Sequence, residues 1–207
     1  MRKFCLTIIV LAGFSKALFA QFGNCTASEM QTYTDRETGN TITILTDTLK
    51  NDRFLYQTDP MWTYDEKYLL FRSSSRANDK KIERTLPNGE KRSWTPTQIY
   101  FIEMATGQII QATEGPDLGS AFLANKSNRM FISRKEKEDW NMYVMDLDKF
   151  FADVKKGKVG KPTAYETLLG TFPTSMGRPG GYAIDCNDDY AYITVEREGT
   201  EEEKERM

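Results

Sequence analysis

The sequence contains a repeated hairpin pattern that restricts the fold of this chain. The segments YDEKYLLFRS, NKSNRMFISR and NDDYAYITVE each place a polar turn before a run rich in β-branched and aromatic residues. They align Tyr68, Arg129 and Tyr190, each 61 residues after the one before. A short apolar stretch precedes every copy, so each unit predicts a strand, a tight turn and a second strand. The repeat therefore predicts an all-β chain made of similar units.

Further strands extend the first two units. QIYFIEMATG resembles NMYVMDLDKF, with Tyr100 aligned with Tyr143, and it adds a third strand to each unit. QIIQAT follows a turn and adds a fourth strand to the first unit. Because positions 100 and 143 are only 43 residues apart, we interpret residues 76–94 as an insertion in the first unit. Four-stranded units of this length predict a β-propeller of the WD-repeat kind, incomplete here at about two and a half blades.

The first twenty residues predict a signal peptide. Arg2 and Lys3 precede the apolar stretch 4–14, and Ala20 offers a small residue for cleavage. The apolar stretch is too short to span a membrane. We therefore expect a mature chain that starts near Gln21 and is periplasmic or secreted, without a membrane span.

The predicted organisation follows from the leader and the repeat. Residues 21–207 are expected to form the propeller part. Its blade-like units are placed near 53–113, 118–169 and 171–207.

Composition excludes several functions. Lys and Arg number 28 and Asp and Glu number 30, so no basic surface for nucleic acid is expected. The chain contains no histidine, which removes the commonest metal ligand and the commonest general base. We therefore assign no catalytic residue and no metal ligand. Cys25 and Cys186 could form a disulfide in an oxidising compartment, but two cysteines alone do not settle the pairing.

Several other residues have structural interpretations. Asp65 and Glu66 resemble an acid and base pair, but they fall at a hairpin turn, where Asp commonly bonds the local backbone. Lys126 and Ser127 occupy the equivalent positions in the next unit, so a turn is predicted. The three tryptophans, Trp62, Trp94 and Trp140, could stack on sugar rings, although a Trp at a strand end more often packs between sheets.

The framework motifs carry a family resemblance. YDEKYLLF followed by IYFIEMATGQIIQAT resembles TolB-type propellers. More narrowly, ETGNTITILT, NDRFLYQTDPMWTYDEKYLLF, ATGQIIQATEGPDLGSAFLANKSNRMFIS and GGYAIDCNDDYAYITVERE resemble, in this order, the N-terminal half of oligogalacturonate lyases. The resemblance covers nearly all of the expected mature chain. It also implies that the strand TITILT completes the last blade of a closed propeller.

The resemblance implies a function in pectin breakdown. Members of that family are seven-bladed propellers that cleave oligogalacturonate by β-elimination, with manganese held by three histidines and a glutamine, and with another histidine thought to be the base. None of these ligands can be placed on a chain without histidine. We therefore expect an N-terminal fragment of an exported lyase-like protein, inactive alone and without a cofactor of its own. The alternative is a non-catalytic TolB-like propeller module that binds a glycan or a protein.

Substrate contacts are expected on the loops that lead from one blade into the next. An oligogalacturonate carries a carboxylate on each sugar, and the arginine fork matches a carboxylate. Arg53 and Arg178 are the arginines of these loops, and Tyr56 and Gln57 lie beside the first as sugar contacts. The alternative is that both arginines form ordinary ion pairs with acids such as Asp52 or Asp59.

Overall fold

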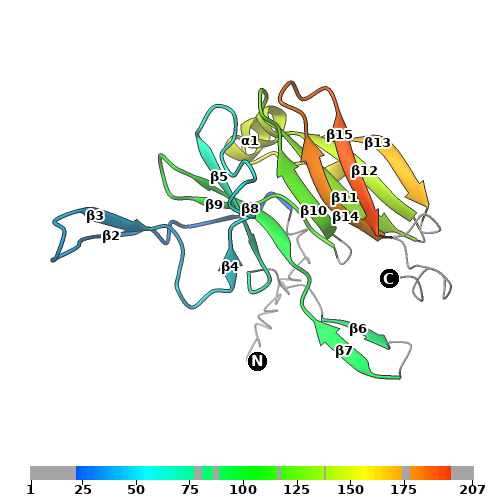
Figure 1. Ribbon diagram of the computed structural model, residues 1–207. Helices are drawn as coiled ribbons and strands as arrows, with labels where there is room; N and C mark the ends of the chain where they lie inside the picture. The colour runs from blue at the N-terminus through cyan, green and yellow to red at the C-terminus, as the bar shows by residue number, and fades with distance from the viewer. Residues whose placement is uncertain are drawn as a thin grey trace, which may run out of the picture.

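The computed structural model describes residues 22–76, 81–85, 89–115, 118–137, 139–173 and 178–196. Small antiparallel sheets and one α-helix make up this part of the chain (Figure 1). The all-β prediction is confirmed at this level, with the helix as an exception. The expected signal peptide lies outside the described residues. Within the described ranges, no helix is long and apolar enough to cross a lipid bilayer.

The first sheet contains the first predicted unit. Its strands run in the order β1 (Cys25–Thr26), β9 (Ile109–Gln111), β8 (Gln98–Glu103), β5 (Tyr68–Ser73) and β4 (Asp52–Arg53). Every residue of β5 except Arg72 is buried. Leu70 packs into the main core on one face, and Phe71 packs into a smaller cluster on the other face. Burial on both faces explains why this strand does not alternate between apolar and polar residues, as predicted.

The second sheet follows the first along the chain. Its order is β10 (Leu118–Leu123), β11 (Arg129–Glu136), β12 (Asp139–Asp146) and β13 (Glu166–Pro173). A two-stranded sheet of β14 (Arg178–Ile184) and β15 (Ala191–Glu196) comes next. The expected boundary between the second and third units, at 169–171, lies inside β13.

The register of the repeat is visible in the turns. The backbone N–H groups of residues 63, 124 and 185 donate to the carbonyl oxygens of residues 68, 129 and 190, at 3.0, 2.9 and 3.0 Å. The same closing hydrogen bond therefore recurs every 61 residues, which confirms the alignment made on the sequence. The predicted first strand at Pro60–Thr63 is reduced to a single bridge between Trp62 and Leu69.

Asp65 and Glu66 form the turn that was predicted for them. Glu66 adopts a φ of 58° and donates its backbone N–H to the carbonyl of Thr63 at 2.8 Å. The Asp65 carboxylate accepts from the Thr63 hydroxyl and from Lys67 Nζ, both at 2.8 Å. Burial alone would raise the pKa of Asp65, but these hydrogen bonds outweigh it and lower the pKa. The carboxylate therefore stabilises its own turn.

Two further hairpins extend away from the sheets (Figure 1). One pairs β2 (Gln31–Thr34) with β3 (Thr41–Ile44), and the other pairs β6 (Ile82–Thr85) with β7 (Lys91–Trp94). The β6–β7 hairpin lies within the insertion predicted at 76–94. Strand β3 contains the TITI of the leading strand, and among the described residues it pairs only with β2.

The helix α1 (Leu147–Lys155) was not predicted, because the sequence interpretation continued the strand NMYVMDLDKF as far as Phe150. Strand β12 instead ends at Asp146, whose carboxylate caps the helix by accepting from the Lys149 N–H at 3.0 Å. The helix buries Leu147, Phe150, Phe151 and Val154, at the spacing of one helical face. This spacing was the missed signal. A 3-10 turn, Pro162–Ala164, then leads into β13.

The helix connects the first two sheets. Phe151 stacks on Tyr68 of the first sheet with ring centroids 3.6 Å apart, and it meets Phe101 edge-on at 5.1 Å. Met130 and Ile132 of the second sheet belong to the same buried cluster. The main core therefore lies between the two sheets and is covered by the helix, so that burial of apolar surface holds the two sheets together.

An ion pair adds to this connection. Lys155 Nζ of the helix lies 2.8 Å from Glu103 Oε1 at the end of β8. Hydrogen bonds from Lys155 and Thr106 lower the pKa of Glu103. A lowered carboxyl pKa stabilises the fold above the unfolded-state pKa of about 4.3, and this stabilisation is lost as the pH falls through the folded-state value.

We therefore expect the free energy of unfolding to fall with acidification between about pH 5 and pH 3, and to fall less steeply in Glu103→Gln. Urea titrations of both proteins at several pH values measure the two slopes. Equal slopes would show that Glu103 is not coupled to folding.

Candidate functional site

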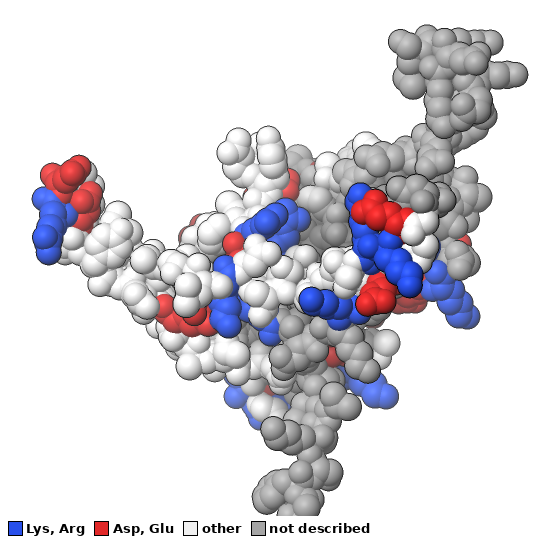
Figure 2. Space-filling model, turned by 90° about the horizontal axis from the view of Figure 1, so that it is seen from below, with Lys and Arg blue, Asp and Glu red and all other residues white. Residues whose placement is uncertain are grey.

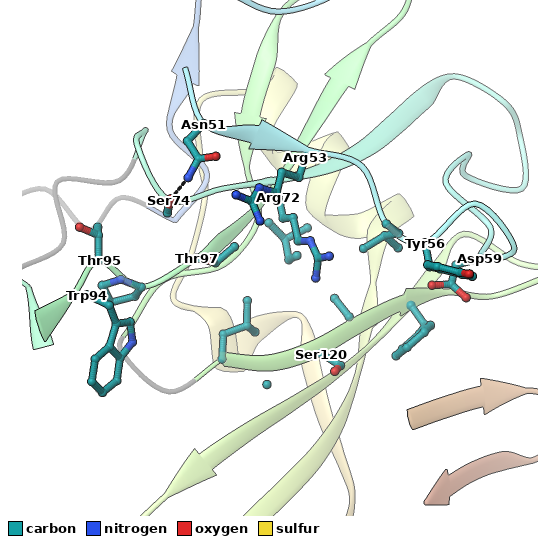
Figure 3. Close-up of a pocket in the computed structure, with 17 residues that line it drawn as sticks. Asn51, Arg53, Tyr56, Asp59, Arg72, Ser74, Trp94, Thr95, Thr97 and Ser120 are labelled. Atoms are coloured by element: carbon teal, nitrogen blue, oxygen red, sulfur yellow. Dashed lines mark hydrogen bonds between the residues drawn. The ribbon is translucent and has the colours of Figure 1, made fainter. Parts of the chain in front are cut away.

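A cavity at the described surface lies between the first and second sheets. It has a volume of about 700 Å³, within the range of small-ligand sites. Its wall is formed by the segment around β4, the C-terminal end of β5, residues 94–97 and strand β10 (Figure 3). Two of the loops that lead from one blade into the next, the loop that carries Arg53 and the loop that ends at Gly119, therefore meet at one cavity.

Two arginines lie directly opposite each other in this wall. Arg53 of β4 and Arg72 of β5 are register partners in the antiparallel pair, and both side chains are exposed. Within the described part of the chain, neither has a carboxylate at ion-pair distance. Four other described arginines do have such a partner: Arg76, Arg92, Arg129 and Arg134. Like charges directly opposite on neighbouring strands are destabilising, so this pair is not explained by the fold.

The expected alternative for Arg53 does not hold. The Asp52 carboxylate binds Arg76 instead, with Arg76 Nε 2.9 Å from Asp52 Oδ1. Asp59 lines the cavity but forms no ion pair among the described residues, and its backbone N–H donates to the Tyr56 carbonyl at 2.8 Å. Arg53 is therefore available to an anion from solution.

The polar groups are distributed along the cavity. In Figure 3, the side chains of Arg53 and Arg72 lie between Trp94 and Thr95 on one side and Tyr56 and Asp59 on the other. Carboxylate and hydroxyl oxygens near the ends can accept or donate hydrogen bonds, whereas the two guanidinium groups only donate. The arrangement suits an elongated ligand with an anionic group near its middle and hydroxyl groups around it.

A second, smaller cavity adjoins the first. It has a volume of about 210 Å³ and shares Asp59 and Phe122 with the larger cavity. Its wall also includes Tyr182 and Ala183 of β14. The two cavities lie along residues 56–60, between the first sheet and the two-stranded sheet of β14 and β15.

The predicted substrate contacts fall in different places. Arg53 and Tyr56 both line the larger cavity. Gln57 is exposed beside it and does not line it. Arg178 begins β14, where its backbone lies opposite Glu196, and its side chain is outside the described part. The structure therefore brings two of the four residues together, and their role in binding stays a prediction.

Sequence reasoning missed Arg72 and did not assign Trp94 to a site. Arg72 follows the buried run Tyr68–Phe71, so an exposed arginine at the end of a strand was a visible signal. Its partner Arg53 lies on a two-residue strand without a hydrophobic pattern, and the pairing could not be predicted. Trp94 ends the inserted hairpin, lines the cavity and is 39% exposed.

The charges of this side of the molecule are scattered. Figure 2, the view from below, shows basic and acidic side chains in small separate groups on a largely uncharged face.

The described residues do not fit a manganese site. They contain no group of three or more His, Cys, Asp or Glu side chains that could hold a metal ion, and the whole chain lacks histidine. Cys25 and Cys186 are both exposed and unpaired, so the disulfide left open by the sequence is not formed.

The architecture resembles that of solved protein structures. No protein-family model matches the sequence, and no curated protein matches it. A solved structure described as oligogalacturonate lyase in complex with manganese is 19% identical, with a TM-score of 0.55 over 81% of this chain and 36% of that one. Oligogalacturonate lyase from Vibrio parahaemolyticus gives the same identity and TM-score over 80% of this chain and 35% of that one. This chain shares its fold with part of the oligogalacturonate lyases.

The match confirms the resemblance noted on the sequence at the level of the fold, and it supports a β-propeller-like arrangement of successive sheets. The chain spans about a third of the length of these two lyase structures. The manganese in the first of them is a property of that protein.

Proposed function

We propose that this chain is the N-terminal, substrate-binding portion of an exported oligogalacturonate-lyase-like β-propeller that acts in pectin breakdown. Its ligand is an acidic oligosaccharide, bound over the cavity that Arg53 and Tyr56 line, with Gln57 and Arg178 as further contacts. The observation that carries the proposal is the arginine pair, which has no carboxylate partner among the described residues, in a chain that shares its fold with lyases named for oligogalacturonate.

The contribution of this chain is to hold and orient the substrate. Guanidinium groups bind carboxylates through charge-assisted hydrogen bonds, which are roughly twice as strong as neutral ones. β-Elimination also needs a group that stabilises the developing negative charge and a base that removes a proton. The described residues do not provide a metal site for the first task, and no histidine is present for the second. In this proposal, both come from parts of the protein beyond this chain.

We expect the chain to bind trigalacturonate and not to cleave it. Isothermal titration should detect binding of trigalacturonate and no binding of neutral trigalactose, because the paired arginines need an anion. Absorbance near the ultraviolet band of unsaturated uronates should stay constant when the same mixture is supplied with manganese. Absence of trigalacturonate binding would contradict the binding role, and a rise in absorbance would contradict the assignment of catalysis to other parts of the protein.

One observation favours the alternative of a non-catalytic TolB-like module. The lack of histidine and of a metal-ligand group in the described residues is what such a module would show. A module of this kind would bind a neutral glycan or a protein at the same cavity. Binding of trigalactose as strong as that of trigalacturonate would support it over the lyase-like proposal.

A further inference from the structure

Strand β15 has an open edge on the side where the equivalent strands of the first two sheets have a partner. β5 pairs with both β4 and β8, and β11 pairs with both β10 and β12. Among the described residues, β15 pairs with β14 alone (Figure 1). We infer that this edge is an interface for a second copy of the chain, whose own β15 pairs with it antiparallel about a two-fold axis. The inference does not depend on the proposed function.

The register of the β14–β15 hairpin shows which backbone groups point toward the open edge. The Asp185 N–H donates to the Tyr190 carbonyl at 3.0 Å, so the hydrogen-bonding groups of Tyr190 face β14. Because this direction alternates along an antiparallel strand, the N–H and C=O groups of Ala191 and Ile193 point away from β14. A strand laid along this edge would pair with these groups, as β8 does with β5.

β15 lacks the features that usually protect an open strand edge, which are short length, a bulge, proline or charged side chains. The outer strands of the first sheet, β1 and β4, have two residues each. Those of the second sheet, β10 and β13, are interrupted by register shifts. β15 is six residues long, and residues 191–195 carry no charge and include no proline. This edge is therefore suited to pairing with another strand.

The outward face of the third sheet carries exposed aromatic residues beside this edge. Tyr190 and Tyr192 are 67% and 60% exposed. The equivalent residues of the first unit, Tyr68 and Leu70, are 3% and 0% exposed, because the second sheet and the helix cover them. Clustered exposed aromatic residues are typical of protein interfaces. The face and the edge of β15 therefore both lack the cover that the same positions have in the first sheet.

A second copy of β15 fits the geometry of this edge. β8 and β12 both run antiparallel to the strands with which they pair. Two identical strands related by a two-fold axis perpendicular to the sheet are also antiparallel, and such an interface is self-complementary. A pairing centred on Ile193 places Tyr192 opposite Thr194 of the partner subunit. Tyr192 of the partner subunit is then its diagonal neighbour, within reach of an aromatic side chain.

The charges of the strand agree with this pairing. In the register centred on Ile193, Glu196 falls opposite Tyr190 of the partner subunit, so no like charges oppose each other. The residues that follow β15 in the sequence are less suited to the edge, because eight of the eleven residues 197–207 are charged. Glu and Lys are depleted in strands. The uncharged β15 of a second copy is therefore the preferred partner.

The test is the mass of the full chain in solution, measured by light scattering after gel filtration over about a 100-fold range of protein concentration. The wild-type chain should change from monomer to dimer as the concentration rises. Ala191→Pro should remain a monomer, because proline removes an N–H that points to the open edge and leaves the pairing with β14 intact. Tyr192→Lys should weaken the dimer about 10-fold, because two like charges then lie on neighbouring strands.

Tyr33→Lys is the matched control, because Tyr33 is a 52% exposed tyrosine on strand β2 of the separate β2–β3 hairpin. It should dimerise as the wild type does. Circular dichroism of the diluted monomers will show that each variant is folded. Hydrogen exchange at Ala191 and Ile193 should become slower as the wild-type concentration rises, because pairing protects these amides.

Each result supports or overturns the inference. A wild-type chain that stays monomeric at every concentration would overturn it. So would Ala191→Pro and Tyr192→Lys variants that dimerise as strongly as Tyr33→Lys does. Slow exchange at Ala191 and Ile193 that does not depend on concentration would show that another part of the same chain covers the edge, and would also overturn it. Dimerisation without binding of trigalacturonate would contradict the proposed function and leave this inference intact.

Discussion

Replacing Arg76 by methionine is expected to lower the free energy of unfolding by about 3–5 kcal/mol, the range for removing one partner of a buried ion pair. The Arg76 side chain is 7% exposed and binds two carboxylates. Its Nη1 and Nη2 donate to Glu29 at 2.9 and 2.6 Å, and its Nε donates to Asp52 at 2.9 Å. Methionine fills similar volume but leaves two acidic groups close together with no cation between them.

Arg76 also holds the candidate site in place. It connects the segment before β2 to β4, and β4 carries Arg53. Its guanidinium carbon lies 5.3 Å from the centre of the Phe71 ring on β5. Burial alone would lower the pKa of Arg76, but the hydrogen bonds with Glu29 and Asp52 outweigh it and raise the pKa. The charge is therefore retained at any pH at which the protein is folded.

Arg92→Met is the matched control for this prediction. Arg92 pairs with Glu90 at 3.2 Å on an exposed hairpin, where an ion pair contributes about 0–1 kcal/mol. Urea unfolding followed by tryptophan fluorescence measures both variants. A loss in Arg76→Met no larger than that in Arg92→Met would show that the Glu29, Arg76 and Asp52 network does not stabilise the fold.

Replacing Asp188 by asparagine is expected to cost about 2–3 kcal/mol, from hydrogen bonds to a charged acceptor. The Asp188 side chain is 1% exposed. Its two carboxylate oxygens accept from the backbone N–H groups of Asn125 and Lys126, at 2.6 and 2.8 Å. The asparagine amide would direct N–H donors at one of these N–H groups. Asparagine tolerates the φ of 64° at this position, so the change tests the hydrogen bonds and not the backbone.

The effect of Asp188→Asn should be concentrated in one region. Asp188 lies in the turn between β14 and β15, and its carboxylate accepts hydrogen bonds from the turn between β10 and β11. Loss of these bonds should weaken the contact of β14 and β15 with the second sheet. Hydrogen exchange of the β14 and β15 amides should become faster than exchange in β5. Asp189→Asn is the control, because the exposed Asp189 side chain forms no hydrogen bond within the described residues. Equal exchange rates in the two variants would contradict the role of Asp188.

The repeated framework could be predicted from the sequence because each hairpin depends on residues that are close together in the chain. The run Tyr68–Phe71 and the turn at Asp65 and Glu66 are short-range signals, and the hydrogen bonds that close the hairpins confirm their register. Helix α1 was missed for a local reason as well: its apolar residues adjoin a real strand, β12, and the strand period was extended over them.

The links between units could not be predicted in the same way. Ser127 and Asp188 occupy equivalent turn positions of the repeat, yet the Ser127 hydroxyl donates to the Asp188 carboxylate at 3.1 Å, across 61 residues of chain. The candidate site could not be predicted either, since the pairing of Arg53 with Arg72 depends on a two-residue strand. The position of Trp94 depends on how an inserted hairpin folds back to the cavity. Contacts of this kind are fixed by tertiary packing, and no periodic pattern marks them.

A crystal structure of the chain with trigalacturonate would show whether this cavity is an acidic-sugar site. We expect a uronate carboxylate within hydrogen-bond distance of the Arg53 and Arg72 guanidinium groups. A trisaccharide bound at another surface, or bound here with its carboxylates turned away from both arginines, would contradict it.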